Sequence, residues 1–271
     1  MNSRNKNLHD LEQPALKLEQ ISVHYDGLPA LNKVSFRLKR GERIAVIGPN
    51  GAGKSTLFNV ISGVLKPSSG RVTVYGSAPD QHACIAYIPQ RSRVDWQFPA
   101  NVADVVMMGR VGRIGLFRRP KKVDWDLVYQ ALELVEMAGL AKRQIGQLSG
   151  GQQQRVFIAR ALAQEADLLL MDEPMMGLDI QSQNTIFTLL DRLQASHVTV
   201  LVATHNLNLA AKHFDQLLLL QGRLVGFGPP ATVFKPELLS QVYGGQLHLI
   251  ETAAGTMLIN ESHQPEVIPY V

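Results

Sequence analysis

The chain of 271 residues has one cysteine, Cys84, and no long apolar run. A single cysteine excludes an intramolecular disulfide and favours a reducing compartment. A membrane-spanning helix needs ~18 or more apolar residues, whereas the most apolar runs here are residues 168–171 and 217–220. The polar start, residues 1–13, lacks the apolar segment of a signal peptide. We therefore expect a soluble chain that is not exported.

Strong charge of one sign is also lacking. The net charge is +4, and Lys and Arg are dispersed except in residues 109–122, which hold six basic side chains. Most charge runs of this kind are solvated faces. We therefore expect no nucleic-acid partner.

What the chain does have is a glycine-rich loop at residues 48–56 (GPNGAGKST), between an apolar run and a helix-like segment. Such a loop lets backbone N–H groups converge on phosphate, and the helix N-terminus adds partial positive charge. The pattern predicts that Lys54 contacts the β- and γ-phosphates and that Ser55 ligates Mg²⁺. An ordinary glycine-rich turn would not explain why every position of the phosphate-loop motif carries the residue that the motif requires. The other residues predicted to form the loop are Gly48, Pro49, Asn50, Gly51, Ala52, Gly53 and Thr56.

Two acids, Asp172 and Glu173, end the buried run at residues 168–171. In a parallel sheet, ligands bind at the carboxyl ends of the strands. Asp172 is therefore predicted to hold the Mg²⁺ that Ser55 also holds, and Glu173 to orient or deprotonate an attacking water. The alternative is a pair of exposed acids before a proline turn.

Three more side chains stand where expected strands end. Gln90 follows residues 84–88, and His205 follows residues 198–203, where it can contact a γ-phosphate. By themselves, a glutamine in such a place is usually an ordinary loop residue and a lone histidine is usually structural. Tyr25 either covers the edge of the core or stacks on a nucleotide base.

Residues 148–152 (LSGGQ) open a helix that we expect to run to about Gln164, with Ser149 as its N-cap. Gly150 and Gly151 at the start of this helix make a second place where an anion can bind backbone N–H groups. Taken alone, the segment is also explained as a plain capped helix.

The wider pattern predicts a mixed α/β fold. Loose alternation at residues 16–23 and 31–38 predicts an antiparallel β portion before the phosphate loop. From about 91 to 150 the β-branched runs thin out, and residues 101–108 and 124–138 show helical spacing. We therefore expect a mostly parallel sheet, an N-terminal antiparallel β portion and a helical insert.

Together and in this order, the motifs resemble those of the ATP-binding cassette (ABC) ATPases over roughly residues 16–243. The phosphate loop matches their Walker A motif, residues 168–173 their Walker B motif with its glutamate, and residues 148–152 their signature. Gln90 matches the Q-loop and His205 the switch histidine. Asp179 matches the D-loop aspartate and Tyr25 the adenine-stacking aromatic residue.

The resemblance implies a P-loop NTPase core that hydrolyses ATP with Mg²⁺. Its implied catalytic residues are Lys54, Gln90, Glu173 and His205, with Gln90 also a Mg²⁺ ligand. It also implies a head-to-tail dimer in which each ATP lies between Lys54 of one copy and the signature of the other, the residues Ser149, Gly150, Gly151 and Gln152, with Asp179 nearby.

A finer resemblance lies in residues 89–99 (PQRSRVDWQFP), 108–110 and 117–120, which look like the cassettes of manganese, zinc and iron importers. It implies a separate integral membrane permease, an extracytoplasmic solute-binding protein and a place at the cytoplasmic face of the membrane. In a simpler interpretation, Trp96 and Phe98 only anchor the insert to the core. One departure from the family pattern, Met175-Met176, puts the packing of the D-loop in doubt.

Other functions remain open at this point. The cargo could be a ferric siderophore or another small solute, since nothing in an ATPase subunit touches it. ABC ATPases of DNA repair or translation have either two cassettes in one chain or one cassette split by a long coiled coil. This sequence has neither pattern. A P-loop kinase is a further alternative, but it would leave the motif at residues 148–152 unexplained.

The expected domain organisation is a flexible tail at 1–15, an ABC ATPase domain at 16–243 with its helical subdomain at about 91–150, and an extension at 244–271. The structure of this extension is left undecided, with a short hairpin as one possibility.

Overall fold

The computed structural model describes residues 13–79, 84–115 and 117–244. Beyond these it describes the backbone of three strands, β10 (Leu247–Thr252), β11 (Gly255–Asn260) and β12 (Glu266–Val267). Residues 1–12 of the expected tail lie outside the described residues. In the C-terminal extension, β10 and β11 pair as an antiparallel hairpin.

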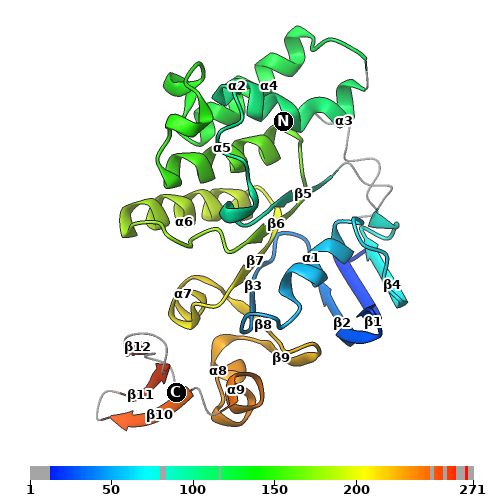
Figure 1. The fold of residues 1–271 in the computed structure, drawn as a ribbon, viewed down its shortest axis with the longest axis vertical. Helices are drawn as coiled ribbons and strands as arrows, with labels where there is room; N and C mark the ends of the chain where they lie inside the picture. Colours follow the sequence, from blue (N-terminus) through cyan, green and yellow to red (C-terminus); the bar gives the residue numbers. More distant parts are fainter. Residues whose placement is uncertain are drawn as a thin grey trace.

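A six-stranded sheet forms the centre of the molecule (Figure 1). Its strands in spatial order are β5 (Ile85–Ile88), β6 (Leu168–Asp172), β7 (Thr199–Thr204), β3 (Arg43–Ile47), β8 (Gln216–Leu220) and β9 (Leu224–Gly228). The first five are parallel, and β9 returns antiparallel to β8 as a hairpin. The predicted mostly parallel sheet is therefore confirmed, and the strand ends that carry the candidate site residues lie along one edge.

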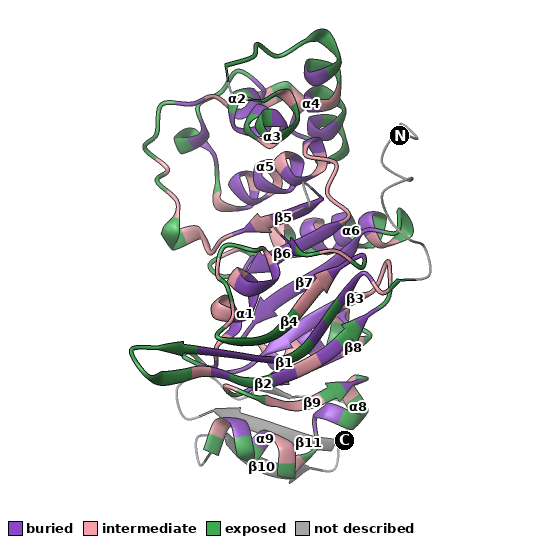
Figure 2. Cartoon of the chain, turned by 90° about the vertical axis from the view of Figure 1, so that its right-hand side faces the viewer, coloured by how far each residue is buried: buried purple, intermediate pink, exposed green. Residues whose placement is uncertain are grey.

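Both faces of the parallel part of this sheet are largely buried, as Figure 2 shows, whereas β9 is mostly half-buried. In β3, Ala45 and Ile47 pack in one hydrophobic core, whereas Ile44 and Val46 pack in a second core on the opposite face. Burial on both faces explains why these strands are nearly continuous apolar runs in the sequence.

The second core lies between the central sheet and a three-stranded antiparallel sheet. That sheet has the order β2-β1-β4, with β1 (Leu16–Tyr25), β2 (Leu28–Leu38) and β4 (Ser69–Val74). The helix α1 (Lys54–Ile61) contributes to the same core. The antiparallel portion is confirmed, although β2 begins at Leu28 and not at 31. Asp26 and Gly27 alone make the turn, both with positive φ (49° and 80°), a geometry suited to a two-residue hairpin.

The predicted helical insert gathers at one end of the molecule (Figure 1). Its helices are α2 (Val102–Met107), α3 (Val111–Ile114) and α4 (Lys122–Leu134), and α5 (Gly150–Ala163), which begins where the predicted insert ends, packs against α2 and α4. Asn101 caps α2 in a capping box with Asp104. The helix expected at 124–138 is α4, which begins at Lys122 and ends at Leu134. It ends earlier than expected because Glu136 takes a left-handed φ of 59° and Met137 N–H donates back to Leu132 O at 2.8 Å.

The remaining helices flank the central sheet. They are α6 (Ile180–Ala195), α7 (Leu207–His213), α8 (Pro230–Val233) and α9 (Pro236–Tyr243). Across the part of the chain that the structure describes, no helix has the length and apolar character needed to cross a membrane.

Candidate nucleotide-binding site

The glycine-rich loop joins β3 to α1 and is shaped by close packing. Gly51 and Gly53 have φ of 84° and 93°, a backbone conformation that glycine adopts without strain. A Cβ on Gly48 would lie 2.3 Å from Leu220 O, and one on Gly53 would lie 2.7 Å from Ala30 O. These two glycines are therefore needed because other backbone segments occupy the space of a side chain.

The turn between β8 and β9 holds this loop in place. Gly222 N–H donates to Ala52 O at 2.9 Å, and Gly222 O accepts from Asn32 N–H at 2.6 Å. The loop is thus linked by hydrogen bonds to the hairpin β8–β9, and through it to β2.

Lys54, the first residue of α1, is only 7% exposed. Its Nζ donates to Gly48 O at 2.5 Å and to Pro49 O at 3.1 Å, and lies 3.8 Å from Glu173 Oε1. Burial lowers the pKa of this ammonium group, while the nearby carboxylates of Glu173 and Asp172 oppose that shift. The positive charge therefore stands at the mouth of the loop, beside the acids at the end of β6.

Ser55 and Asp172 meet directly. Ser55 Oγ donates to Asp172 Oδ2 at 2.7 Å, and Asp172 is 3% exposed. Tyr87 OH donates to the same oxygen at 3.3 Å, and Arg93 Nη1 lies 3.8 Å from it. Burial raises the pKa of Tyr87 to about 12, so this phenol remains a donor near neutral pH. The residue pair predicted to share a cation is thus assembled.

Glu173 also lies where the sequence placed it, but in an uncommon backbone conformation. Its φ is 49°, in the left-handed region that non-glycine residues rarely adopt. His205 Nδ1 lies 3.0 Å from Glu173 Oε2. Glu173 Oε1 is buried and accepts no hydrogen bond from the residues that the structure describes. One carboxylate oxygen is therefore held by histidine, and the other lies 3.8 Å from Lys54 Nζ without a hydrogen bond to any described residue.

Gln90 and Tyr25 stand at the ends of their strands. Gln90 Nε2 donates to the sulfur of Met176 at 3.5 Å, so the glutamine lies against the loop that follows β6. Tyr25 ends β1 and is 47% exposed. Met175 is buried and Met176 is 42% exposed, so one methionine of the unusual pair packs in the core and the other contacts Gln90.

The start of α5 is capped as expected. Ser149 is exposed, its Oγ accepts from Gln152 N–H at 3.4 Å, and Gln152 Oε1 accepts from Ser149 N–H at 3.0 Å. A Cβ on Gly151 would lie 2.4 Å from Ser182 Oγ. Ser182 in turn donates to Asp179, the N-cap of α6, and these hydrogen bonds lower the pKa of the Asp179 carboxyl. The structure thus packs the starts of α5 and α6 together.

Three contacts at this site were not predicted from the sequence: Tyr87 and Arg93 beside Asp172, and Arg91 beside α5. Arg91 Nε donates to Gln153 Oε1 at 3.0 Å. All three residues lie within three positions of Gln90, so the strand-to-loop junction was the signal available, although nothing in it indicates which side chain turns toward Asp172.

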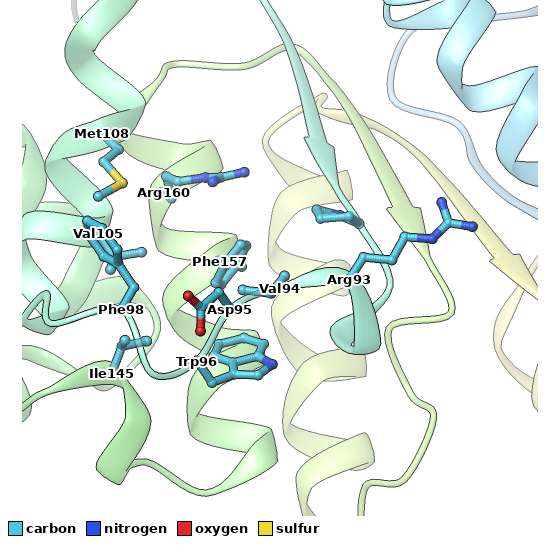
Figure 3. Close-up of a pocket in the computed structure, with 11 residues that line it drawn as sticks. Arg93, Val94, Asp95, Trp96, Phe98, Val105, Met108, Ile145, Phe157 and Arg160 are labelled. Atoms are coloured by element: carbon cyan, nitrogen blue, oxygen red, sulfur yellow. The ribbon is translucent and has the colours of Figure 1, made fainter.

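A cavity of about 300 Å³ opens directly after Gln90 (Figure 3). It is lined by residues of the segment after β5, of α2 and the 3₁₀ turn that follows it, and of α5. Its apolar lining includes Val94, Trp96, Phe98, Val105, Met108 and Phe157, and its charged lining is Arg93, Asp95 and Arg160. Trp96 is half-buried, with its ring 5.4 Å from that of Phe157, whereas Phe98 is 53% exposed. Trp96 therefore anchors the segment, and Phe98 does not.

The phosphate loop between β3 and α1, with acids at the end of β6, a parallel strand of the same sheet separated from β3 by β7, defines a P-loop NTPase. Known proteins narrow this class. The family model described as "ABC transporter" matches residues 31–176. The ATP-binding protein MntB of the manganese transport system of Bacillus subtilis (strain 168) is 48% identical over 87% of this chain and 95% of its own length.

Two further comparisons agree. The zinc transport system ATP-binding protein TroB of Treponema pallidum (strain Nichols) is 44% identical over 86% of this chain and 88% of its own. A solved ATP-binding cassette of an ABC transporter, in its ADP conformation, superposes with a TM-score of 0.76 at 26% identity, covering 86% of this chain and 99% of that one. The chain therefore belongs to the ABC transporter family, as one of its ATP-binding, ATP-hydrolysing subunits.

Proposed function

We propose that this chain drives the import of a transition-metal ion, manganese, zinc or iron, through a separate membrane permease. The observation that supports its ATPase part is the contact set of Ser55, Asp172, Glu173 and His205 at the carboxyl ends of β6 and β7. The proposal for the cargo is supported by the relatives named for manganese and zinc transport.

Mg²⁺ fits the donors at Ser55 and Asp172. A hydroxyl and a carboxylate 2.7 Å apart are the hard oxygen ligands that this ion prefers. When bound, Mg²⁺ would neutralise charge on the phosphates. Gln90, whose amide nitrogen donates to the sulfur of Met176 in this structure, would supply a third oxygen ligand.

The protein's own residues perform the following chemistry. Glu173 Oε1 accepts a proton from water as the water oxygen attacks the γ-phosphorus, and the bond from phosphorus to the bridging oxygen of ADP breaks. His205 holds Glu173 Oε2 and contacts the γ-phosphate. Lys54 exchanges the carbonyl oxygens of Gly48 and Pro49 for phosphate oxygens, and so stabilises the charge that develops in the transition state.

The site is completed by a second copy of the chain. Ser149 is exposed at the N-terminus of α5, whose 14 residues give its backbone N–H groups a partial positive charge. In the proposed head-to-tail dimer, Ser149, Gly150, Gly151 and Gln152 of one copy bind the γ-phosphate held by Lys54 of the other, with Asp179 at the interface. Tyr25, at the open end of β1, stacks on adenine.

The permease docks in the cavity after Gln90. An apolar lining with Trp96 and Phe157 suits an amphipathic helix of the partner. Arg93 is drawn extending away from the apolar group in Figure 3, and its guanidinium lies near Asp172. A partner bound in the cavity would therefore contact Arg93 and could shift its guanidinium relative to Asp172 at the nucleotide site. In this assembly the chain sits at the cytoplasmic face, with a solute-binding protein on the other side of the membrane.

A metal chelate such as a ferric siderophore is the second candidate cargo. It is favoured by a solved chain described as belonging to a metal-chelate type ABC transporter, which superposes with a TM-score of 0.79 at 30% identity.

The test is metal uptake in a strain that lacks this gene. Uptake of manganese, zinc and iron salts and of a ferric siderophore is measured after complementation with the wild type or with Glu173→Gln. We expect the wild type to restore uptake of one free metal ion and Glu173→Gln to restore none. Restored uptake of the siderophore alone would move the cargo to the second candidate. Copurification with ribosomes or DNA in place of a membrane protein would contradict a transport function.

A further inference from the structure

Arg91, the residue after Gln90, reaches the helix that carries Ser149. It begins a short 3₁₀ turn, Arg91–Arg93, and its Nε donates to Gln153 Oε1 at 3.0 Å. Gln153 lies in the first turn of α5 and is 3% exposed. The contact therefore joins the segment after β5 to the start of α5, through a charged donor and a buried acceptor.

Gln153 is held at its other end as well. Its Nε2 donates to Ile145 O at 3.2 Å, and its backbone N–H donates to Ser149 O at 2.9 Å. A carbonyl oxygen accepts only from the amide nitrogen, and a guanidinium donates only to the amide oxygen. Both contacts thus specify one orientation of the amide, which fixes Arg91 relative to Ser149.

Arg91 is fixed from the cavity side by Trp96. The indole Nε1 of Trp96 donates to Arg91 O at 2.9 Å, and the guanidinium carbon lies 5.8 Å from the centre of the indole ring. Trp96 also lines the cavity after Gln90. The same short chain of contacts therefore runs from the cavity wall to α5.

The guanidinium also explains one glycine of the 149–152 segment. A Cβ on Gly150 would lie 2.8 Å from Arg91 Nη1 and 3.1 Å from Leu178 Cδ2. Arg91 and Leu178 thus both lie next to the backbone of Gly150, and Arg91 occupies space that a side chain at this position would need.

We propose that Arg91 is a positioning residue for ATP hydrolysis. Through its contacts with Gln153 and Gly150, it fixes the position of Ser149 relative to the segment that follows Gln90. This inference rests on the composite site proposed above, in which Ser149 acts on the ATP of a second copy. Arg91 itself touches neither nucleotide nor water in this scheme. Its loss should therefore change the position of Ser149 relative to the ATP of the second copy and leave the phosphate loop of its own copy intact.

The test uses the full chain with Arg91→Ala, Gln153→Ala and the double variant. We expect each to lower kcat about tenfold, the loss typical of one hydrogen bond to a charged group, with ATP affinity of the single chain within about twofold of wild type. Both single variants remove the contact between Arg91 and Gln153, and Gln153→Ala also removes the hydrogen bond to Ile145 O. The double variant should therefore lose no more than Gln153→Ala does. In a Glu173→Gln background, ATP-dependent dimerisation measured by light scattering should weaken about tenfold.

Two further variants separate positioning from bulk stability. Gln153→Glu keeps an acceptor for Arg91 but loses the N–H that donates to Ile145 O, so we expect a kcat above that of Gln153→Ala and below that of wild type. Arg118→Ala removes an arginine from an exposed position in the same helical region and serves as the matched control. Thermal unfolding is followed for all variants. If Arg91→Ala does not fold, Arg91→Lys, alone and with Gln153→Glu, replaces it, with the charged pair expected to recover kcat.

Ser149→Arg is measured in the same assay. If it abolishes hydrolysis and dimerisation while Arg91→Ala keeps both within about twofold of wild type, the positioning role is wrong and the composite site stands. If Ser149→Arg leaves both unchanged, the composite site is wrong. A double variant that loses about the product of the two single losses would also overturn the role of the Arg91–Gln153 contact.

Discussion

The phosphate-loop region and the start of α5 both present helix N-termini, yet they are built in opposite ways. Lys54, Asp172 and Glu173 are at most 9% exposed, and each contacts a residue from another element. Ser149 is exposed, and its hydroxyl accepts a hydrogen bond from its own helix. One region is thus preorganised within a single chain, where fixed dipoles act most strongly. The other offers donors to something outside the chain, in keeping with the proposed dimer.

Glu173→Gln should break the chemistry of the first region and leave the second unchanged. The amide cannot accept a proton, so we expect kcat to fall about 10³-fold, within the usual range for a general base. ATP binding should persist, and the dimer should accumulate in ATP. Single-turnover phosphate release and light scattering measure the two effects. Glu133→Gln, on the exposed face of α4, is the control. Turnover at the wild-type rate would remove Glu173 from catalysis.

Lys54→Ala should weaken the first region at the binding step. Its ammonium is predicted to donate to phosphate oxygens, and the loss of such charged hydrogen bonds lowers affinity about 10- to 100-fold. Titration with a fluorescent ATP analogue gives the affinity. Lys66→Ala removes an exposed lysine in the turn after α1 and should bind as wild type does. Equal affinity of the two variants would contradict the role of the loop.

Gly151→Ala tests the second region through its packing. The new Cβ would lie 2.4 Å from Ser182 Oγ, and overpacking of this kind lowers the free energy of unfolding by about 1 to 3 kcal/mol. Hydrolysis should fall as well, since the clash displaces the start of α5. Gly139→Ala is the matched control, because a Cβ at Gly139 would have no atom of the described residues within 4 Å. Urea unfolding compares them, and equal stability would show that the two helix starts are not tightly packed.

His213, at the end of α7, belongs to neither region and offers a comparison for these effects. Its ring stacks on that of Phe187, with the two ring centroids 3.7 Å apart. Burial lowers the pKa of His213, helped by the charges of Lys212 and Arg43 and opposed by Asp191. The folded state therefore binds a proton less readily than the unfolded state. Stability should fall as the pH drops from about 6.5, the pKa of an unperturbed imidazole, through the lower pKa of the folded state.

The matching measurement is thermal unfolding at pH 7.5 and pH 5.5. We expect wild type to lose about 1 to 2 °C more in Tm between these values than His213→Gln does. Equal losses in the two proteins would mean that His213 carries no part of the pH dependence.

The same contrast between the two regions explains what the sequence could predict. Gly48, Asp172, Glu173 and His205 lie at or next to strand ends, and an apolar run that stops at a polar residue indicates such an end. Ser149 was recognisable as an N-cap for the same local reason.

Contacts that depend on strand order were not predictable. Tyr87 reaches Asp172 because β5 pairs with β6, with Tyr87 opposite Leu170. Nothing local to residues 84–88 specifies that neighbour. Likewise, α3 lies inside residues 109–122, for which the sequence indicated no helix. Four residues of helix are too few to show a periodic pattern.

The backbone of Glu173 has a consequence for how this chain tolerates change. A non-glycine residue at φ 49° costs about 1 to 2 kcal/mol of backbone strain, so the carboxylate at the centre of the proposed mechanism stands on a strained backbone. The strain is held by the surrounding fold, in which the side chain of Glu173 lies beside His205 and the buried ammonium of Lys54. A substitution that removes this side chain and keeps a Cβ retains the strain and leaves the charge of Lys54 with one carboxylate fewer.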